Sequence, residues 1–138
     1  MLAKCYTRLL ENLGGNLVSS RIFGIDPGTY RLGYGLLEES HGDMSFVSSG
    51  VIVPDRRLSL AFRLNSIYQE LLKLVDYWKP EDIAVEEPFV SQNPRTAIAI
   101  GQAQAVVLVV AASRDMEVSR YTPREVKHVV SGYGNSSK

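Results

Sequence analysis

The change in hydrophobic period along the chain constrains its fold more than any other feature. Short apolar runs with the length of strands cover residues 21–26, 33–38, 44–53, 82–85 and 118–121. Between the third and fourth runs, apolar residues recur every three or four positions from 58 to 78, which indicates an amphipathic helix. A second helical stretch, residues 96–113, separates the last two runs. The predicted order is three strands, helix, strand, helix, strand.

The ends of these predicted elements carry recognisable signals. Residues 40–43 read Ser-His-Gly-Asp, a turn between the second and third strands. Asn93 before Pro94 is typical of the start of the second helix. Thr122, Pro123 and Glu125 fit an N-cap, a first helical position and a capping box, so a third helix is predicted from there to about residue 131.

This order predicts an α/β fold with a mixed five-stranded sheet flanked by helices. Three consecutive short strands form an antiparallel meander, because the connections between them are short. A helical crossover then brings the fourth strand parallel to the first, which lies in the centre of the sheet. The carboxyl ends of the first and fourth strands therefore meet at one edge, where open α/β sheets carry their chemistry.

Length and composition favour one intracellular domain. The chain has 138 residues, 45% of them hydrophobic, which is enough for one core but not for two. We expect a poorly ordered extension over residues 1–20 and a domain over residues 21–138. Cys5 is the sole cysteine, which fits a reducing, cytoplasmic compartment. The apolar stretch 97–112 contains two glutamines and is read as too short and too interrupted to span a membrane.

Two carboxylates stand at the ends of predicted buried strands. Asp26 closes the first strand in Gly-Ile-Asp-Pro-Gly, and Glu86 closes the fourth in Ala-Val-Glu-Glu-Pro. Pro27 keeps Asp26 extended, so its carboxylate projects from the strand end. Carboxylate oxygens suit hard cations such as Mg²⁺ or Mn²⁺. Strand alternation places Glu86 and Glu87 on opposite faces without deciding between them. The pattern predicts metal-assisted phosphodiester cleavage.

Taken together, the motifs resemble those of the RuvC-type Holliday junction resolvases. They are Gly-Ile-Asp-Pro-Gly at 24–28, Gly-Tyr-Gly at 33–35, Ala-Val-Glu at 84–86, Phe89, Gly-Gln-Ala at 101–103 and Arg-Glu-Val-Lys at 124–127. The resemblance covers about residues 22–138. It implies a ribonuclease H-like fold and a homodimer that cuts four-way junction DNA in recombination and repair.

The resemblance also implies roles for individual residues. It makes Asp26 and Glu86 the catalytic metal ligands, selects Glu86 over Glu87, and implies two Mg²⁺ ions in the complete family site. It places Phe89 against bases near the crossover, and Lys127 and Lys138 near the cleaved phosphates. The apolar helix at 96–113 is expected to form the dimer interface, because a small domain cannot cover it fully. A branch-migration helicase is an expected partner.

One departure from the family pattern affects the expected activity. The family completes its site with further acidic residues some twenty or more positions beyond Lys138. We therefore expect a resolvase lacking its C-terminal part, with impaired cleavage. A non-catalytic dimeric module that binds branched DNA is the alternative. An ATPase phosphate loop over residues 24–35 is a third interpretation, although such enzymes need a second lobe for which this chain is too short.

Overall fold

The computed structural model describes residues 19–87 and 93–122. Its elements are β1 (Ser20–Asp26), β2 (Leu32–Ser40), β3 (Asp43–Ile52), α2 (Leu60–Trp78), β4 (Asp82–Glu86), α3 (Pro94–Ala112) and β5 (Glu117–Tyr121). The predicted order of these elements is confirmed, with boundaries that differ by one or two residues. Of the extension predicted over residues 1–20, residues 1–18 lie outside the described residues, as does the predicted third helix, and Ser20 already belongs to β1.

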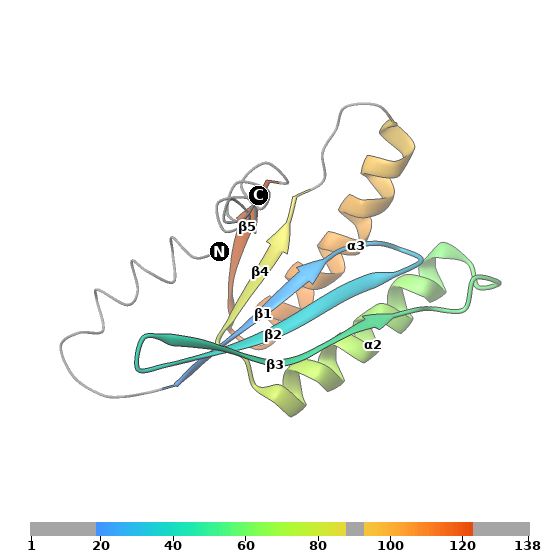
Figure 1. Cartoon of the computed structure of the whole chain (residues 1–138). Coiled ribbons are helices and arrows are strands. Elements are labelled where there is room, and N and C mark those ends of the chain that lie inside the picture. Colours follow the sequence, from blue (N-terminus) through green and yellow to red (C-terminus); the bar gives the residue numbers. More distant parts are fainter. Residues whose placement is uncertain (1–18, 88–92, 123–138) are drawn as a thin grey trace, which may run out of the picture.

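The five strands form one mixed sheet in the order β3-β2-β1-β4-β5. The strands β1, β2 and β3 pair antiparallel, whereas β4 pairs parallel with both β1 and β5. The predicted meander and the central place of β1 are therefore confirmed. Figure 1 shows the arrows of β1 and β4 pointing the same way, so their carboxyl ends share one edge of the sheet.

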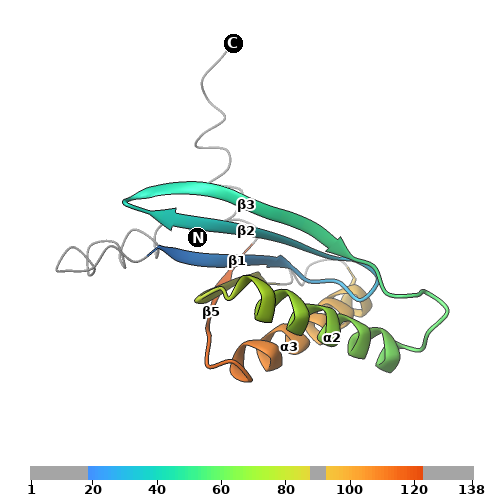
Figure 2. The ribbon, with the colours of Figure 1, turned by 90° about the horizontal axis from the view of Figure 1, so that it is seen from below.

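The helices α2 and α3 both cover the same face of the sheet, as Figure 2 shows. The core lies between that face and the helices, and its fully buried large side chains are Phe23, Leu32, Leu36, Ile67, Leu71, Ile83, Val85, Val107 and Val110. Among the described residues no helix covers the other face of the sheet. That face is called the open face below.

The helix α3 is buried along one side only. Its buried residues follow one stripe that includes Ala103, Val107 and Val110, while Ile98 and Val109 are 62% and 57% exposed. The incomplete cover expected for this apolar helix is therefore confirmed for the described residues. By length and composition α3 could cross a membrane, contrary to the expectation from residues 97–112, but one such helix is weak evidence. It packs on α2, β4 and β5 as a helix of the domain.

Local signals account for the ends of the helices. The Asn93 side chain accepts hydrogen bonds from the backbone N–H groups of Arg95 and Thr96, at 3.1 and 3.4 Å, and Pro94 occupies the first turn of α3. The predicted N-cap is thereby confirmed. The helix α2 begins at Leu60, two residues later than predicted, and ends at Lys79 in the left-handed conformation, whose N–H donates to the Val75 carbonyl.

Candidate active site

Asp26 is the last residue of β1 and its side chain is exposed. The loop that follows turns sharply at Gly28, where an added Cβ would lie 2.4 Å from the Arg31 carbonyl oxygen. No side chain fits there without moving the loop. Gly33 of β2 lies opposite Asp26 in the sheet, and a Cβ there would lie 3.7 Å from the Asp26 Cβ. The absence of a side chain at Gly33 helps to leave the Asp26 carboxylate accessible.

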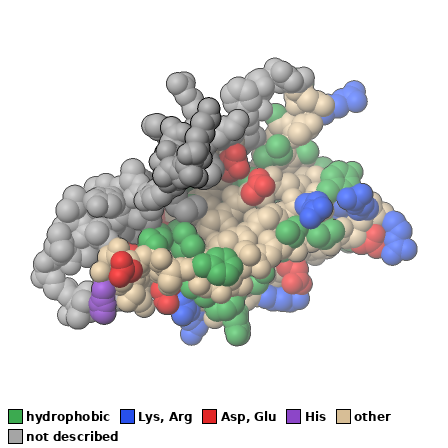
Figure 3. All heavy atoms as spheres, in the orientation of Figure 1, with side chains coloured by type: hydrophobic (Ala, Val, Ile, Leu, Met, Phe, Trp, Pro, Cys, Tyr) green, Lys and Arg blue, Asp and Glu red, His purple; other side chains and the backbone are tan. Residues whose placement is uncertain are grey.

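Glu86 ends β4 on the same face as Asp26. In the parallel register Ile25 pairs with Val85, and both are buried against the helices. Because successive side chains alternate between faces, the next residue of each strand points to the open face. The two side chains that meet there are the carboxylates of Asp26 and Glu86. Figure 3 shows acidic side chains gathered on this face of the molecule.

The electrostatics of Glu86 reflect this arrangement. Partial burial, and then the negative charge of Asp26, raise the pKa of the Glu86 carboxyl above its ordinary value. Burial disfavours an isolated charge, and a second carboxylate nearby disfavours it further. A divalent cation between the two groups would relieve both effects. The pair therefore has the donor chemistry and the unfavourable charge of a cation site.

Two carboxylates alone make an incomplete set of ligands. In residues 19–87 and 93–122 there is no group of three or more His, Cys, Asp or Glu side chains that could hold a metal ion. Hard cations take six or more oxygen ligands, so the remaining ones must come from water, phosphate oxygens or other protein groups. Asp26 and Glu86 could supply the carboxylate ligands of such a site.

Glu87, the alternative to Glu86, lies in a different position. Its backbone N–H donates to the carbonyl of Tyr121 at 2.7 Å, which continues the pairing of β4 with β5. By strand alternation its side chain leaves the strand away from Asp26. The structure therefore brings Asp26 and Glu86 together and leaves Glu87 apart. The predicted nucleic-acid contacts Phe89, Lys127 and Lys138 lie outside the described residues.

Sequence reasoning missed a buried arginine close to this edge. Arg63 on α2 is only 9% exposed, and its guanidinium carbon lies 4.1 Å from the centre of the Tyr30 ring in the β1–β2 loop. A signal was present in the sequence, because Arg63 stands four residues before Ile67 on the apolar stripe of α2. Position on a buried stripe, rather than residue type, would have identified it.

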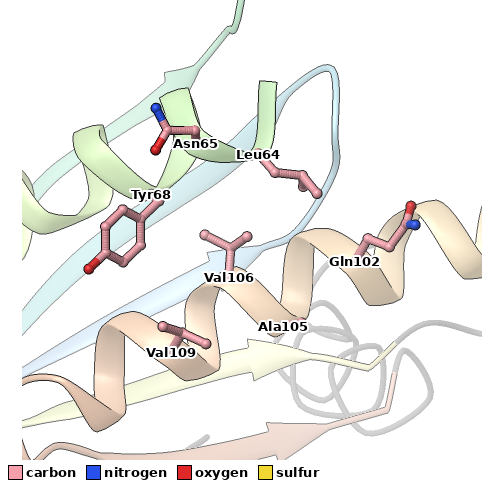
Figure 4. Close-up of a pocket in the computed structure, with 7 residues that line it drawn as sticks. All are labelled: Leu64, Asn65, Tyr68, Gln102, Ala105, Val106 and Val109. Atoms are coloured by element: carbon pink, nitrogen blue, oxygen red, sulfur yellow. The ribbon is translucent and has the colours of Figure 1, made fainter. Parts of the chain in front are cut away.

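A second concave region lies between the two helices, away from the carboxylates. This groove of about 400 Å³ is lined by Leu64, Asn65, Tyr68, Gln102, Ala105, Val106 and Val109. Figure 4 shows these residues coming from the facing sides of α2 and α3. Its lining is mainly apolar and contains no ionisable carboxylate or histidine. Its lining therefore supplies no carboxylate or imidazole group for phosphoryl chemistry.

Comparison with known proteins connects this geometry to one family. Residues 22–138 match the family described as crossover junction endodeoxyribonuclease RuvC. A protein of that description from Pseudothermotoga lettingae is 44% identical over 117 residues, which are 85% of this chain and 72% of the relative. Another from Thermosipho melanesiensis is 42% identical over 118 residues, 86% of this chain and 75% of the relative.

Solved structures agree with these sequence relatives. Thermus thermophilus RuvC is 28% identical with a TM-score of 0.71, over 86% of this chain and 73% of that one. A structure of T. thermophilus RuvC in complex with Holliday junction substrate gives a TM-score of 0.73 over 80% of this chain and 69% of that one. The yeast mitochondrial Holliday junction resolvase Ydc2, 14% identical with a TM-score of 0.62, shares the fold. The expected ribonuclease H-like fold class is confirmed.

Proposed function

This chain belongs to the RuvC family of crossover junction endodeoxyribonucleases, and we propose that Asp26 and Glu86 carry its cleavage of four-way junction DNA. The family acts as metal-dependent, structure-specific endonucleases. The observation that supports the assignment is the meeting of two carboxylates on one face, at adjacent carboxyl ends of β1 and β4. The reaction is hydrolysis of a phosphodiester in each of two strands.

The chain's own residues prepare this site in three ways. The accessible Asp26 and the partly buried Glu86 hold oxygen ligands toward the open face, and their mutual repulsion favours binding of a cation. Gly28 allows the tight turn after Asp26, and Gly33 places no side chain beside the Asp26 carboxylate. When bound, a pair of Mg²⁺ or Mn²⁺ ions supplies activation of water and charge stabilisation at the departing 3′-oxygen.

Contacts with the junction are proposed for three further residues on the family resemblance. Phe89 would stack on a base at the crossover, a contact worth about 1–3 kcal/mol. Lys127 and Lys138 would neutralise phosphates beside the cut. We further propose that a branch-migration helicase is the partner that delivers the junction to this protein. The protein is proposed to act in the cytoplasm.

A homodimer through α3 accounts for paired cuts. The exposed Ile98 and Val109 lie on a helix that the described chain covers on one side only. The apolar groove between α2 and α3 adjoins the same surface (Figure 4). A two-fold axis there would bury this surface on both copies and place two identical sites on one junction. Val109→Asp should therefore turn a dimer into a monomer in sedimentation equilibrium.

The proposal is tested by nicking of a synthetic four-way junction in Mg²⁺, followed on denaturing gels. Asp26→Asn and Glu86→Gln should each slow nicking by about 100-fold or more, because each removes about 3 kcal/mol of charge stabilisation at the cation site. Glu87→Gln is the matched control and should nick at the unaltered rate. Loss of nicking in the Glu87 variant with retention in the Glu86 variant would contradict the assignment.

A non-catalytic junction-binding module is the second candidate. The observation that favours it is that the described part of the chain gathers two carboxylates and no third metal-ligating group around the site. This candidate predicts that the unaltered chain and Asp26→Asn bind the junction with equal affinity and that neither nicks it. Symmetric, metal-dependent nicks by the unaltered chain would exclude it.

A further inference from the structure

Two loops leave the sheet at the same edge as Asp26. The β1–β2 loop, residues 27–31, follows Asp26 directly, and the β3–α2 loop, residues 53–59, follows β3. Because Asp26 pairs with Gly33 and Leu32 pairs with Ile52, both loops start at this edge. Figure 3 shows Lys and Arg side chains gathered at one end of the molecule, on the same view as the acidic side chains of the open face.

Arg63 of α2 contacts both of these loops. Its guanidinium group lies 4.1 Å from the centre of the Tyr30 ring in the first loop. Its Nη1 donates to the Leu58 carbonyl of the second loop at 3.0 Å. A cation on an aromatic face and a charge-assisted hydrogen bond are both strengthened where water is excluded. The side chain is nine-tenths buried, so the loops are held in a fixed relation to each other.

The second loop is also ordered by its own contacts. The Asp55 carboxylate accepts the Arg57 backbone N–H at 2.9 Å, and the Leu58 N–H donates to the Asp55 carbonyl at 3.1 Å. The Arg57 guanidinium donates to the same carboxylate at 2.7–3.1 Å. Arg57 is therefore compensated by Asp55 and contributes little net charge to the surface.

Arg31 and Arg56 differ from Arg57 in having no such compensation. Both are exposed, and neither makes an ion pair with any carboxylate in the part of the chain that the structure describes. Each stands on one of the two loops that Arg63 contacts. A guanidinium group matches the geometry of a phosphate and is more weakly hydrated than an ammonium group. The two loops at this edge thus each carry one exposed, uncompensated guanidinium group, whose chemistry suits a polyanion.

We propose that Arg31 and Arg56 form a basic ledge that binds backbone phosphates of the duplex arm extending from the Asp26–Glu86 site. Asp26 lies on β1 and the second loop follows β3, two strands away, which is about 10 Å at the usual strand spacing. That span corresponds to about three nucleotides at about 3.4 Å per step. The inference rests on the proposed junction substrate and specifies where an arm of it lies.

The test measures how binding of a fluorescein-labelled four-way junction depends on salt, by anisotropy, in an Asp26→Asn background that prevents cleavage. Each phosphate neutralised on duplex DNA contributes about 0.9 to the slope of log affinity against log salt, so Arg31→Gln with Arg56→Gln should lower the slope by about 1.8. Between 50 and 200 mM salt the parent should lose about twelvefold more affinity than this double variant. Both positions are exposed, so an unchanged melting temperature is expected.

The matched control is Lys73→Gln with Arg114→Gln, which removes the same charge near the other end of α2. A change in slope of about 1.8 in the ledge variant and less than about 0.5 in the control supports the ledge. Equal slopes in the two double variants, with the parent still preferring the junction to a linear duplex, overturn the ledge and leave the proposed function standing. A parent that binds junction and duplex equally overturns the proposed function and the ledge with it.

Discussion

The contact between Arg63 and Tyr30 allows a quantitative test of how the active-site edge is held. Arg63→Met keeps most of the apolar stem and removes the guanidinium group. The change loses a charged hydrogen bond to the Leu58 carbonyl, worth about 1.5–3 kcal/mol, and the contact with the Tyr30 ring. It also removes the buried Arg63 Nε, which has no hydrogen-bond partner among the described residues and costs about 1–3 kcal/mol. The net destabilisation should be about 1 kcal/mol.

The energy of the contact itself comes from a double-mutant cycle. Tyr30 is 49% exposed and Arg63 is buried. The energy of their cation–π contact should therefore be intermediate between that of a fully exposed pair and that of a desolvated pair, about 1 kcal/mol. Tyr30→Leu, Arg63→Met and the double variant would be compared by urea unfolding. Their coupling free energy should be about 1 kcal/mol in favour of the native pair.

A second cycle provides the control for this measurement. Tyr77 lies near the far end of α2, is 74% exposed, and makes its ring contact with Trp78. Arg63→Met and Tyr77→Leu should be additive within about 0.3 kcal/mol. The same additivity for Arg63 with Tyr30 would refute the argument that this contact holds the β1–β2 loop.

Two further predictions concern the loop turn and the acid stability. Gly28→Ala should destabilise the protein by about 1–3 kcal/mol in urea unfolding, because the new methyl group meets the Arg31 carbonyl. The control Gly35→Ala should cost less than about 0.5 kcal/mol, since no atom lies within 4 Å of a Cβ added there. Equal losses of stability in the two variants would contradict this argument. The Arg114 guanidinium, bonded to Asp76 at 2.7 and 2.9 Å, lowers the pKa of that carboxyl. The stabilising effect of this ion pair is present above the pKa of Asp76 in the unfolded state and is lost as the pH falls through its pKa in the folded state. The melting temperatures of the parent and Asp76→Asn should therefore converge between about pH 4 and 2. A difference in melting temperature that stays constant over this range would count against the pair.

Local sequence patterns determined the order of elements and the ends of the two strands that carry the carboxylates. Hydrophobic period, the Pro-Gly after Asp26 and the Asn-Pro before α3 act over a few residues, so they can be read without knowledge of the fold. The same patterns do not show which side of α3 stays exposed, because hydrophobic period alone does not say which neighbours cover a helix.

Tertiary structure alone decided the features that depend on residues distant in sequence. Strand alternation alone left Glu86 and Glu87 open, and only the family resemblance selected Glu86. The structural reason for Glu86 is the pairing of Ile25 with Val85, a register set by the parallel contact of β1 with β4. The burial of Arg63 follows from the position of the loop that carries Tyr30, 33 residues earlier in the sequence. Such contacts arise when separate segments pack together, and a local pattern contains no information about which partner a segment will meet. The sequence by itself placed a carboxylate at the end of each strand, and the sheet register determined which of them face each other.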